Sequence, residues 1–214
     1  MTTSETHPLV SSAFDRTQLP NGLRILTSTF RHTNAVSIIF LFAAGSRYET
    51  PELAGASHLF EHMLFKGTPT RPTPKEISEV VEGVGGTLNA FTDREVTGYW
   101  CRVAQPNYRD SIDLLADMTL NSFFKDEDIA KEKQVVYEEI RASNDSPGAR
   151  VSMLLDDLLW PDQPLGRDIA GSVESVGAIT REQMLEYLET QYVGSNTVIA
   201  VSGNIEHADV VEQI

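Results

Sequence analysis

Short stretches with strand character, some of them joined by tight turns, constrain the fold of this chain most. In residues 14–28, apolar residues alternate on both sides of Asn21-Gly22, and Asn-Gly between such runs indicates a hairpin. "TLNAFTD" and "EVTGYWCRVA" predict two more strands that meet at a tight turn near Asp93-Arg94. Core strands are also predicted at 35–45 and 196–204. Tight hairpins require antiparallel neighbours, so we expect a mostly antiparallel sheet.

Segments with helical periodicity lie between the strands. The second begins at Pro74 after the N-cap candidate Thr73, and the last begins after Thr180 with Gln183 at the capping-box position. The predicted helices cover residues 55–65, 74–85, 106–122, 126–143, 146–160 and 180–191. Together these patterns predict an α+β fold, a two-layer sandwich with helices packed on one face of the sheet.

Composition narrows the possible partners. The chain of 214 residues is 41% hydrophobic and 22% charged, as is usual for a globular domain, and its net charge is −14. Such acidity argues against nucleic acid and against an anionic membrane surface. The longest apolar run, residues 35–44, is too short to span a bilayer. The polar stretch "MTTSETHPLVSS" does not resemble a secretory signal, so we expect a cytoplasmic protein.

The chain has one cysteine, Cys101, and therefore no internal disulfide. Because it lies within a predicted strand, we interpret it as a small buried hydrophobic residue rather than a reactive thiol. Residues 1–214 contain no internal repeat or glycine-rich linker, and we interpret them as a single domain. The sequence stops inside a segment with helical character, which favours a longer natural protein.

The stretch "GASHLFEHMLFKGT" carries the chemistry. His58 and His62 are four residues apart, so on a helix both imidazoles share one face and can bind one Zn²⁺ ion. Glu61 lies on the same side and can reach a water at the metal. A chance H-x-x-E-H is expected in about one of a hundred such chains. A solvated polar face is the alternative, but it fits poorly because the neighbours are apolar.

A third ligand is expected from "DEDIAKEKQVVYEEIRA". Glu132 and Glu139 are seven residues apart and differ by only about 20° around a helix. We expect this face to point inward because Val135 and Val136 lie along it, whereas Glu138 points about 100° away. We therefore assign Glu139 as the ligand and Glu132 as a supporting residue that holds a histidine or tunes the charge of the site.

At this point the sequence resembles the pitrilysin-type zinc peptidases, above all their bacterial branch similar to the mitochondrial processing peptidase. The resemblance rests on "HLFEHMLFKGT" from His58, "GGTLNAFTDRE" from Gly85, "EKQVVYEEI" from Glu132 and "PLGRDIAGSVESV" from Pro164. It implies one zinc ion held by His58, His62 and Glu139, with Glu132 in support and Glu61 as the catalytic base.

The resemblance implies partners as well. Extended substrate would pair with the strand formed by Leu88, Asn89, Ala90 and Phe91, as an added edge strand. Family members have a second half that closes over the active site. Residues 1–214 would then be the N-terminal catalytic half, with the C-terminal half absent from this sequence. A partner subunit or a homodimer could close the cavity instead.

The expected function is therefore that of a zinc metalloendopeptidase, in which the metal activates a water and Glu61 takes its proton. Two alternatives remain at this stage. One is a weakly active or inactive subunit of the same fold that binds peptides or supports assembly. The other is a zinc hydrolase whose substrate is not a peptide.

Overall fold

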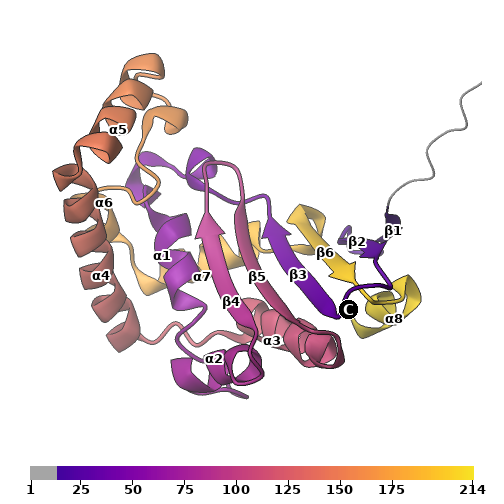
Figure 1. The fold of residues 1–214 in the computed structure, drawn as a ribbon. Helices are drawn as coiled ribbons and strands as arrows, with labels where there is room; N and C mark the ends of the chain where they lie inside the picture. The colour runs from indigo at the N-terminus through magenta and orange to yellow at the C-terminus, as the bar shows by residue number, and fades with distance from the viewer. Residues whose placement is uncertain (1–13) are drawn as a thin grey trace, which may run out of the picture.

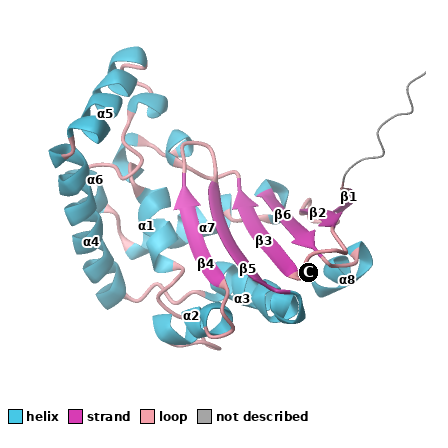
Figure 2. Ribbon diagram, viewed as in Figure 1, coloured by secondary structure: helices cyan, strands magenta, loops and turns pink. Residues whose placement is uncertain are grey.

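A single six-stranded sheet organises the protein (Figures 1 and 2). The structure is a computed structural model and describes residues 14–214; the polar N-terminal stretch noted above lies outside this range. The strands are β1 (Asp15–Gln18), β2 (Arg24–Thr29), β3 (Ala35–Phe42), β4 (Thr87–Thr92), β5 (Thr97–Ala104) and β6 (Thr197–Gly203). Their order in the sheet is β1-β2-β6-β3-β5-β4, so β4 lies at an edge.

Most neighbouring strands run antiparallel, as the turn signals predict. The β1–β2 and β4–β5 pairs are hairpins, and β3 pairs antiparallel with both β5 and β6. The turn at Asn21-Gly22 uses a positive φ of 89° at Gly22, a conformation that glycine adopts without strain. The β2–β6 pair is parallel, which the local turn signals do not predict.

Helices cover one face of this sheet (Figures 1 and 2). The α-helices are α1 (Ala56–Met63), α2 (Pro74–Glu82), α3 (Tyr108–Asn121), α4 (Asp126–Asp145), α5 (Pro147–Leu159), α6 (Val173–Ala178), α7 (Arg181–Gln191) and α8 (His207–Gln213). Of these, α4 and α5 stand beyond the β4 edge of the sheet, where α4 packs against α1. Short 3-10 turns η1 (Ser46–Tyr48), η2 (Pro51–Leu53), η3 (Gln105–Asn107), η4 (Pro164–Gly166) and η5 (Gly194–Asn196) connect them. The predicted α+β sandwich is confirmed, and α6 is a helix that the periodicity did not indicate.

The core lies between the sheet and the helices. Alternate residues of β3, from Val36 to Phe42, are buried against it, and from α1 Leu59, Phe60 and Met63 are fully buried. Cys101 is buried in the same core, and burial raises the pKa of its thiol to about 12. This confirms the interpretation of Cys101 as a buried hydrophobic residue.

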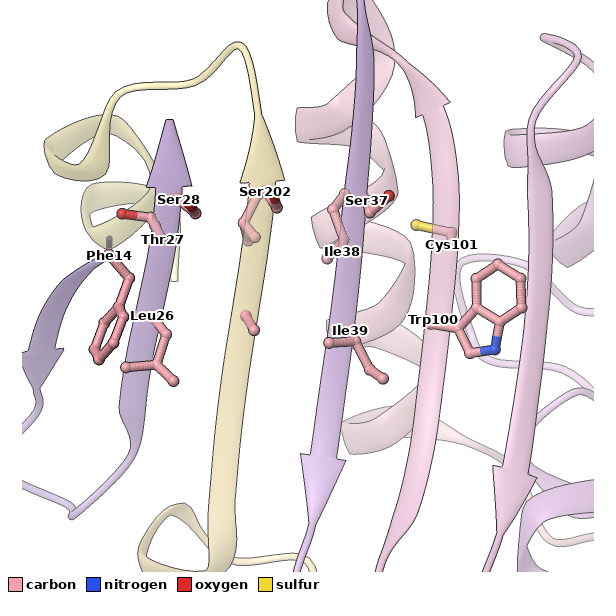
Figure 3. Close-up of a pocket in the computed structure, with 12 residues that line it drawn as sticks. Phe14, Leu26, Thr27, Ser28, Ser37, Ile38, Ile39, Trp100, Cys101 and Ser202 are labelled. Carbon is pink, nitrogen blue, oxygen red and sulfur yellow. The ribbon is translucent and has the colours of Figure 1, made fainter. Parts of the chain in front are cut away.

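The opposite face of the sheet carries an apolar hollow. Figure 3 shows Leu26, Ile39 and Trp100 from three strands, with Phe14 beside β2, around a hollow of about 460 Å³. No helix within residues 14–214 has the length and apolar character required to cross a membrane.

Candidate metal centre

The start of α1 is fixed by contacts that come from outside the helix. Gly55 precedes it with a φ of 92°, and a Cβ atom there would lie 2.5 Å from the carbonyl oxygen of Ala170. The buried carboxylate of Glu49 accepts hydrogen bonds from the backbone N–H groups of Gly55, at 2.9 Å, and Ser57, at 2.7 Å. A negative charge at these free N–H groups is favourable because it opposes the positive end of the helix dipole.

The other half of the site comes from α4, which packs along α1 (Figure 1). Nε2 of His58 lies 3.5 Å from Oε2 of Glu139, and Nε2 of His62 lies 3.6 Å from the same oxygen. Within residues 14–214, His58, His62 and Glu139 form the one group of three such residues with ligand atoms close enough to share a metal ion.

These distances fit a zinc ion. Three donor atoms that bind zinc at about 2.0–2.1 Å in a tetrahedron lie roughly 3.4 Å from one another. The separations of 3.5 and 3.6 Å between each Nε2 atom and Oε2 of Glu139 differ from this value by only a few tenths of an ångström, and the three ligand atoms all lie within 4.8 Å of one another. Two imidazole nitrogens and one carboxylate oxygen are also a donor set that zinc accepts while leaving one position open.

Glu132 lies on the outer side of His62. Its Oε2 atom is 3.1 Å from Nδ1 of His62, and its Oε1 atom is 2.6 Å from Nζ of Lys66. The carboxylate of Glu132 is mostly buried, with a side chain 11% exposed, whereas that of Glu139 is 45% exposed. Glu132 therefore contacts Nδ1 of His62, whereas Glu139 faces the Nε2 atoms of both histidines.

His58 has an environment that favours its neutral form. Burial lowers the pKa of His58, and the nearby His62 lowers it further, while Glu139 and Asp168 raise it in part. A neutral imidazole keeps the lone pair that a metal ion requires. Its Nδ1 atom is buried and has no hydrogen-bond partner among residues 14–214.

Glu61 is held by the last residue of β4. Oγ1 of Thr92 donates a 2.6 Å hydrogen bond to Oε2 of Glu61. Burial raises the pKa of Glu61 and the charge of Glu139 acts in the same direction, whereas the bond from Thr92 and the charge of His62 lower it. A carboxylate with a raised pKa is a stronger base than an ordinary glutamate.

The edge strand β4 carries the residues proposed to meet a peptide. Leu88, Asn89, Ala90 and Phe91 all belong to it. The N–H group of Ala90 donates to Oδ1 of Asn89 at 2.8 Å. β4 lies at the edge of the sheet and is joined to Glu61 by the hydrogen bond from Thr92.

Most of the sequence-based assignments fall in this one place. His58, His62 and Glu139 converge, Glu61 is beside them, and Glu132 contacts His62. Glu138 points away, with a side chain 71% exposed and paired with Arg141, as the helix geometry predicts. The expectation for Val135 is wrong: Val136 is buried, but Val135 is 43% exposed because it lies at the margin of the packed face.

Three contacts of the site were missed by sequence reasoning. Lys66 contacts Glu132, Thr92 contacts Glu61, and Glu49 holds the start of α1. Lys66 and Thr92 both lie within the quoted motifs "HLFEHMLFKGT" and "GGTLNAFTDRE". Their spacing in the sequence carries no information about which glutamate each one contacts.

Comparison with known proteins places the chain in a family. Residues 12–173 match the family model described as Insulinase (Peptidase family M16). The chain belongs to the insulinase family. This agrees with the resemblance noted in the sequence, since its relatives include zinc proteases and a processing-peptidase subunit.

Two relatives illustrate this. An uncharacterized zinc protease of Rickettsia felis is 39% identical over 198 residues, which cover 92% of this chain and 48% of the relative. A probable mitochondrial-processing peptidase subunit beta of Arabidopsis thaliana is 38% identical over 214 residues, which cover 99% of this chain and 40% of the relative.

Solved structures share the fold. A protease from Helicobacter pylori superposes with a TM-score of 0.88 at 25% identity, covering 94% of this chain and 48% of that one. A peptidase M16 inactive domain from Pseudomonas fluorescens superposes with a TM-score of 0.86 at 20% identity, with the same coverage. This insulinase-family chain thus spans about half the length of the proteins it matches.

Proposed function

We propose that this insulinase-family chain is the catalytic half of a zinc-dependent metalloendopeptidase that hydrolyses extended peptides. One observation carries the proposal. Two imidazole nitrogens from α1 and one carboxylate oxygen from α4 converge at separations that fit zinc, with a basic carboxylate beside them. His58, His62 and Glu139 would hold one zinc ion per chain.

In the proposed reaction, the metal, Glu61 and Thr92 have separate roles. A bound zinc ion supplies Lewis acidity, which favours deprotonation of water near neutral pH. Glu61 accepts the proton of the attacking water and later passes it to the leaving amine. Thr92 holds one oxygen of Glu61 so that the carboxylate faces the site.

The edge strand supports a peptide as the substrate. An extended peptide added to β4 would form main-chain hydrogen bonds, and its side chains would meet alternate faces of the strand. Leu88, Asn89, Ala90 and Phe91 are the proposed binding residues. Main-chain pairing of this kind is not available to most non-peptide substrates, which makes a different zinc hydrolase less suited to this site.

The proposed partners follow from the length of the relatives. A second half in the same chain, or a partner subunit, would close the cavity over α1 and β4. A homodimer remains an alternative, and nucleic acid and membranes are not expected as partners. A cytoplasmic location stays a prediction from the sequence, since one relative is named as mitochondrial.

Glu61→Gln tests the function. The variant keeps the size of the side chain but cannot accept a proton. We expect its zinc content to match the wild type, while cleavage of an unstructured peptide by the complete enzyme falls by at least about 10²-fold. Zinc content is measured by elemental analysis and turnover with a quenched fluorescent peptide.

The outcomes separate the alternatives. Cleavage that survives the substitution would remove Glu61 from the mechanism. A wild-type protein that binds zinc and peptide without cleaving the peptide would favour the alternative of an inactive binding subunit. The similar domain from Pseudomonas fluorescens is named as inactive.

A further inference from the structure

We infer that Lys66 is a positioning residue for the metal centre, acting on His62 through Glu132. The inference rests on the proposed function only in taking His62 as a ligand. Lys66 forms its ion pair with Glu132 and with none of the three proposed ligands among residues 14–214. The inference explains why one of two nearby glutamates supports the site instead of binding the metal.

Lys66 and His62 contact the same carboxylate, that of Glu132. Lys66 lies in the turn that ends α1, four residues after His62, with its N–H donating to the carbonyl of Met63 at 3.1 Å. Its Nζ atom contacts Oε1 of Glu132 at 2.6 Å, and Nδ1 of His62 contacts Oε2 at 3.1 Å. Each oxygen of Glu132 therefore has its own partner.

This arrangement fixes the orientation of His62. With Oε1 held by Lys66, Oε2 stays directed at Nδ1, so this nitrogen carries the proton and donates it. Nε2 is then left with its lone pair toward Glu139, 3.6 Å away. Outer hydrogen bonds of this kind set the tautomer and the ring orientation of metal-binding histidines.

Burial makes the contact with Lys66 necessary. Glu132 is 8% exposed, so an oxygen that lost its partner could not turn to bulk water without moving the side chain. Without Lys66, the carboxylate would rotate to satisfy Oε1, and His62 would lose its restraint. Glu139 has no such contact with a lysine among the ion pairs of residues 14–214, and it remains directed at the histidines.

A simpler electrostatic effect predicts the opposite sign. A positive charge near a zinc ion repels it, so removing Lys66 would by itself raise the affinity for zinc. Positioning through Glu132 predicts that the affinity falls. The sign of the change therefore distinguishes the two roles.

The experiment measures zinc affinity by competition with a chromogenic chelator, without substrate. We expect Lys66→Met to weaken zinc binding by about tenfold, the lower end of the range for residues that orient a metal-binding side chain, and Lys66→Arg to restore most of it. In a Glu132→Gln background, Lys66→Met should cause little further loss, because its route to His62 is already gone. Lys131→Met is the control. It also removes one lysine charge, from the residue next to Glu132 on α4, whose side chain is 69% exposed.

Each outcome decides something. Higher affinity in Lys66→Met, an unchanged affinity, or an additive loss in the double variant would overturn the inference. A wild-type chain that binds no zinc would overturn the proposed function and this inference with it. Circular dichroism checks folding, and if Lys66→Met does not fold, Lys66→Gln in the same two backgrounds gives the comparison.

Discussion

At the scale of residues, the roles in the site follow from which atoms are already engaged. The oxygens of Glu132 contact Lys66 and Nδ1 of His62. Neither the Glu132 carboxylate nor Nδ1 of His62 is therefore free to face the metal position. Nε2 of each histidine and Oε2 of Glu139 face one another instead. Two glutamates on one helix face thereby acquire different contacts, from which their different proposed roles follow.

Glu49 gives a prediction for pH at this scale. Burial raises its pKa above the ordinary value of 4.5, while hydrogen bonds from Ser57 and Gly55 and the charge of Arg167 oppose this in part. Between the ordinary and the raised value, the folded chain binds more protons than the unfolded chain, so this contribution to stability falls as pH rises. Glu49→Gln lacks it.

We therefore expect the unfolding free energy of the wild type, minus that of Glu49→Gln, to decrease as pH rises from about 4 toward neutrality. Urea titrations of the metal-free proteins over this range measure the difference. Glu79→Gln, on an exposed face of α2, controls for the loss of one carboxylate. A difference that grows with pH would contradict the assignment.

At the scale of elements, local signals predicted most strands and helices. Asn21-Gly22 and Asp93-Arg94 mark the two hairpins, and the spacing of Glu132 and Glu139 gave the register of α4. The parallel β2–β6 pair joins residues more than 170 positions apart, so no local turn sequence could have predicted it. Helix α6 has only six residues and contains Gly177, so its periodicity is too short to detect.

The same distinction applies to the site. That His58, His62 and Glu139 converge could be predicted because the histidine pair and the glutamate pair each lie on one helix at a fixed spacing. The contacts of Lys66 with Glu132 and of Thr92 with Glu61 join different elements, and they depend on how α1 packs against α4 and β4. Packing of that kind has no signature in the spacing of a single sequence.

The edge strand β4 provides the prediction for this scale. Ala90→Pro removes an N–H group of the edge strand that donates to the side chain of Asn89, and the sheet should persist, since proline is tolerated at sheet edges. We expect the KM for an extended peptide to rise by about tenfold, the scale of one hydrogen bond. Zinc content should not change.

Ala90→Val keeps the N–H group and serves as the control for a change of side chain. An unchanged KM in Ala90→Pro, measured with the same peptide, would remove main-chain pairing at this position from the account of substrate binding.

At the scale of the molecule, this chain carries the proposed metal centre and base but corresponds to about half the length of these relatives. Positioning of substrate contributes several kcal/mol to catalysis, and an open site leaves water around the reacting groups. We expect residues 1–214 alone to fold and bind zinc but to cleave peptides poorly.

Supplying a second half, in the same chain or as a separate one, should raise the activity by orders of magnitude. The measurement compares specific activities on one unstructured peptide at equal zinc content. Equal activities would contradict the prediction and would show that this half is sufficient, alone or as a homodimer.

The central claim is that α4 contributes Glu139, and not its neighbour Glu138, to a zinc site with His58 and His62. Elemental analysis of the wild type, Glu139→Gln and Glu138→Gln after dialysis tests it most directly, because the two variants lose the same charge one residue apart. The account predicts one zinc ion per chain in the wild type and in Glu138→Gln, and loss of zinc in Glu139→Gln. Zinc retained by Glu139→Gln and lost from Glu138→Gln would contradict it.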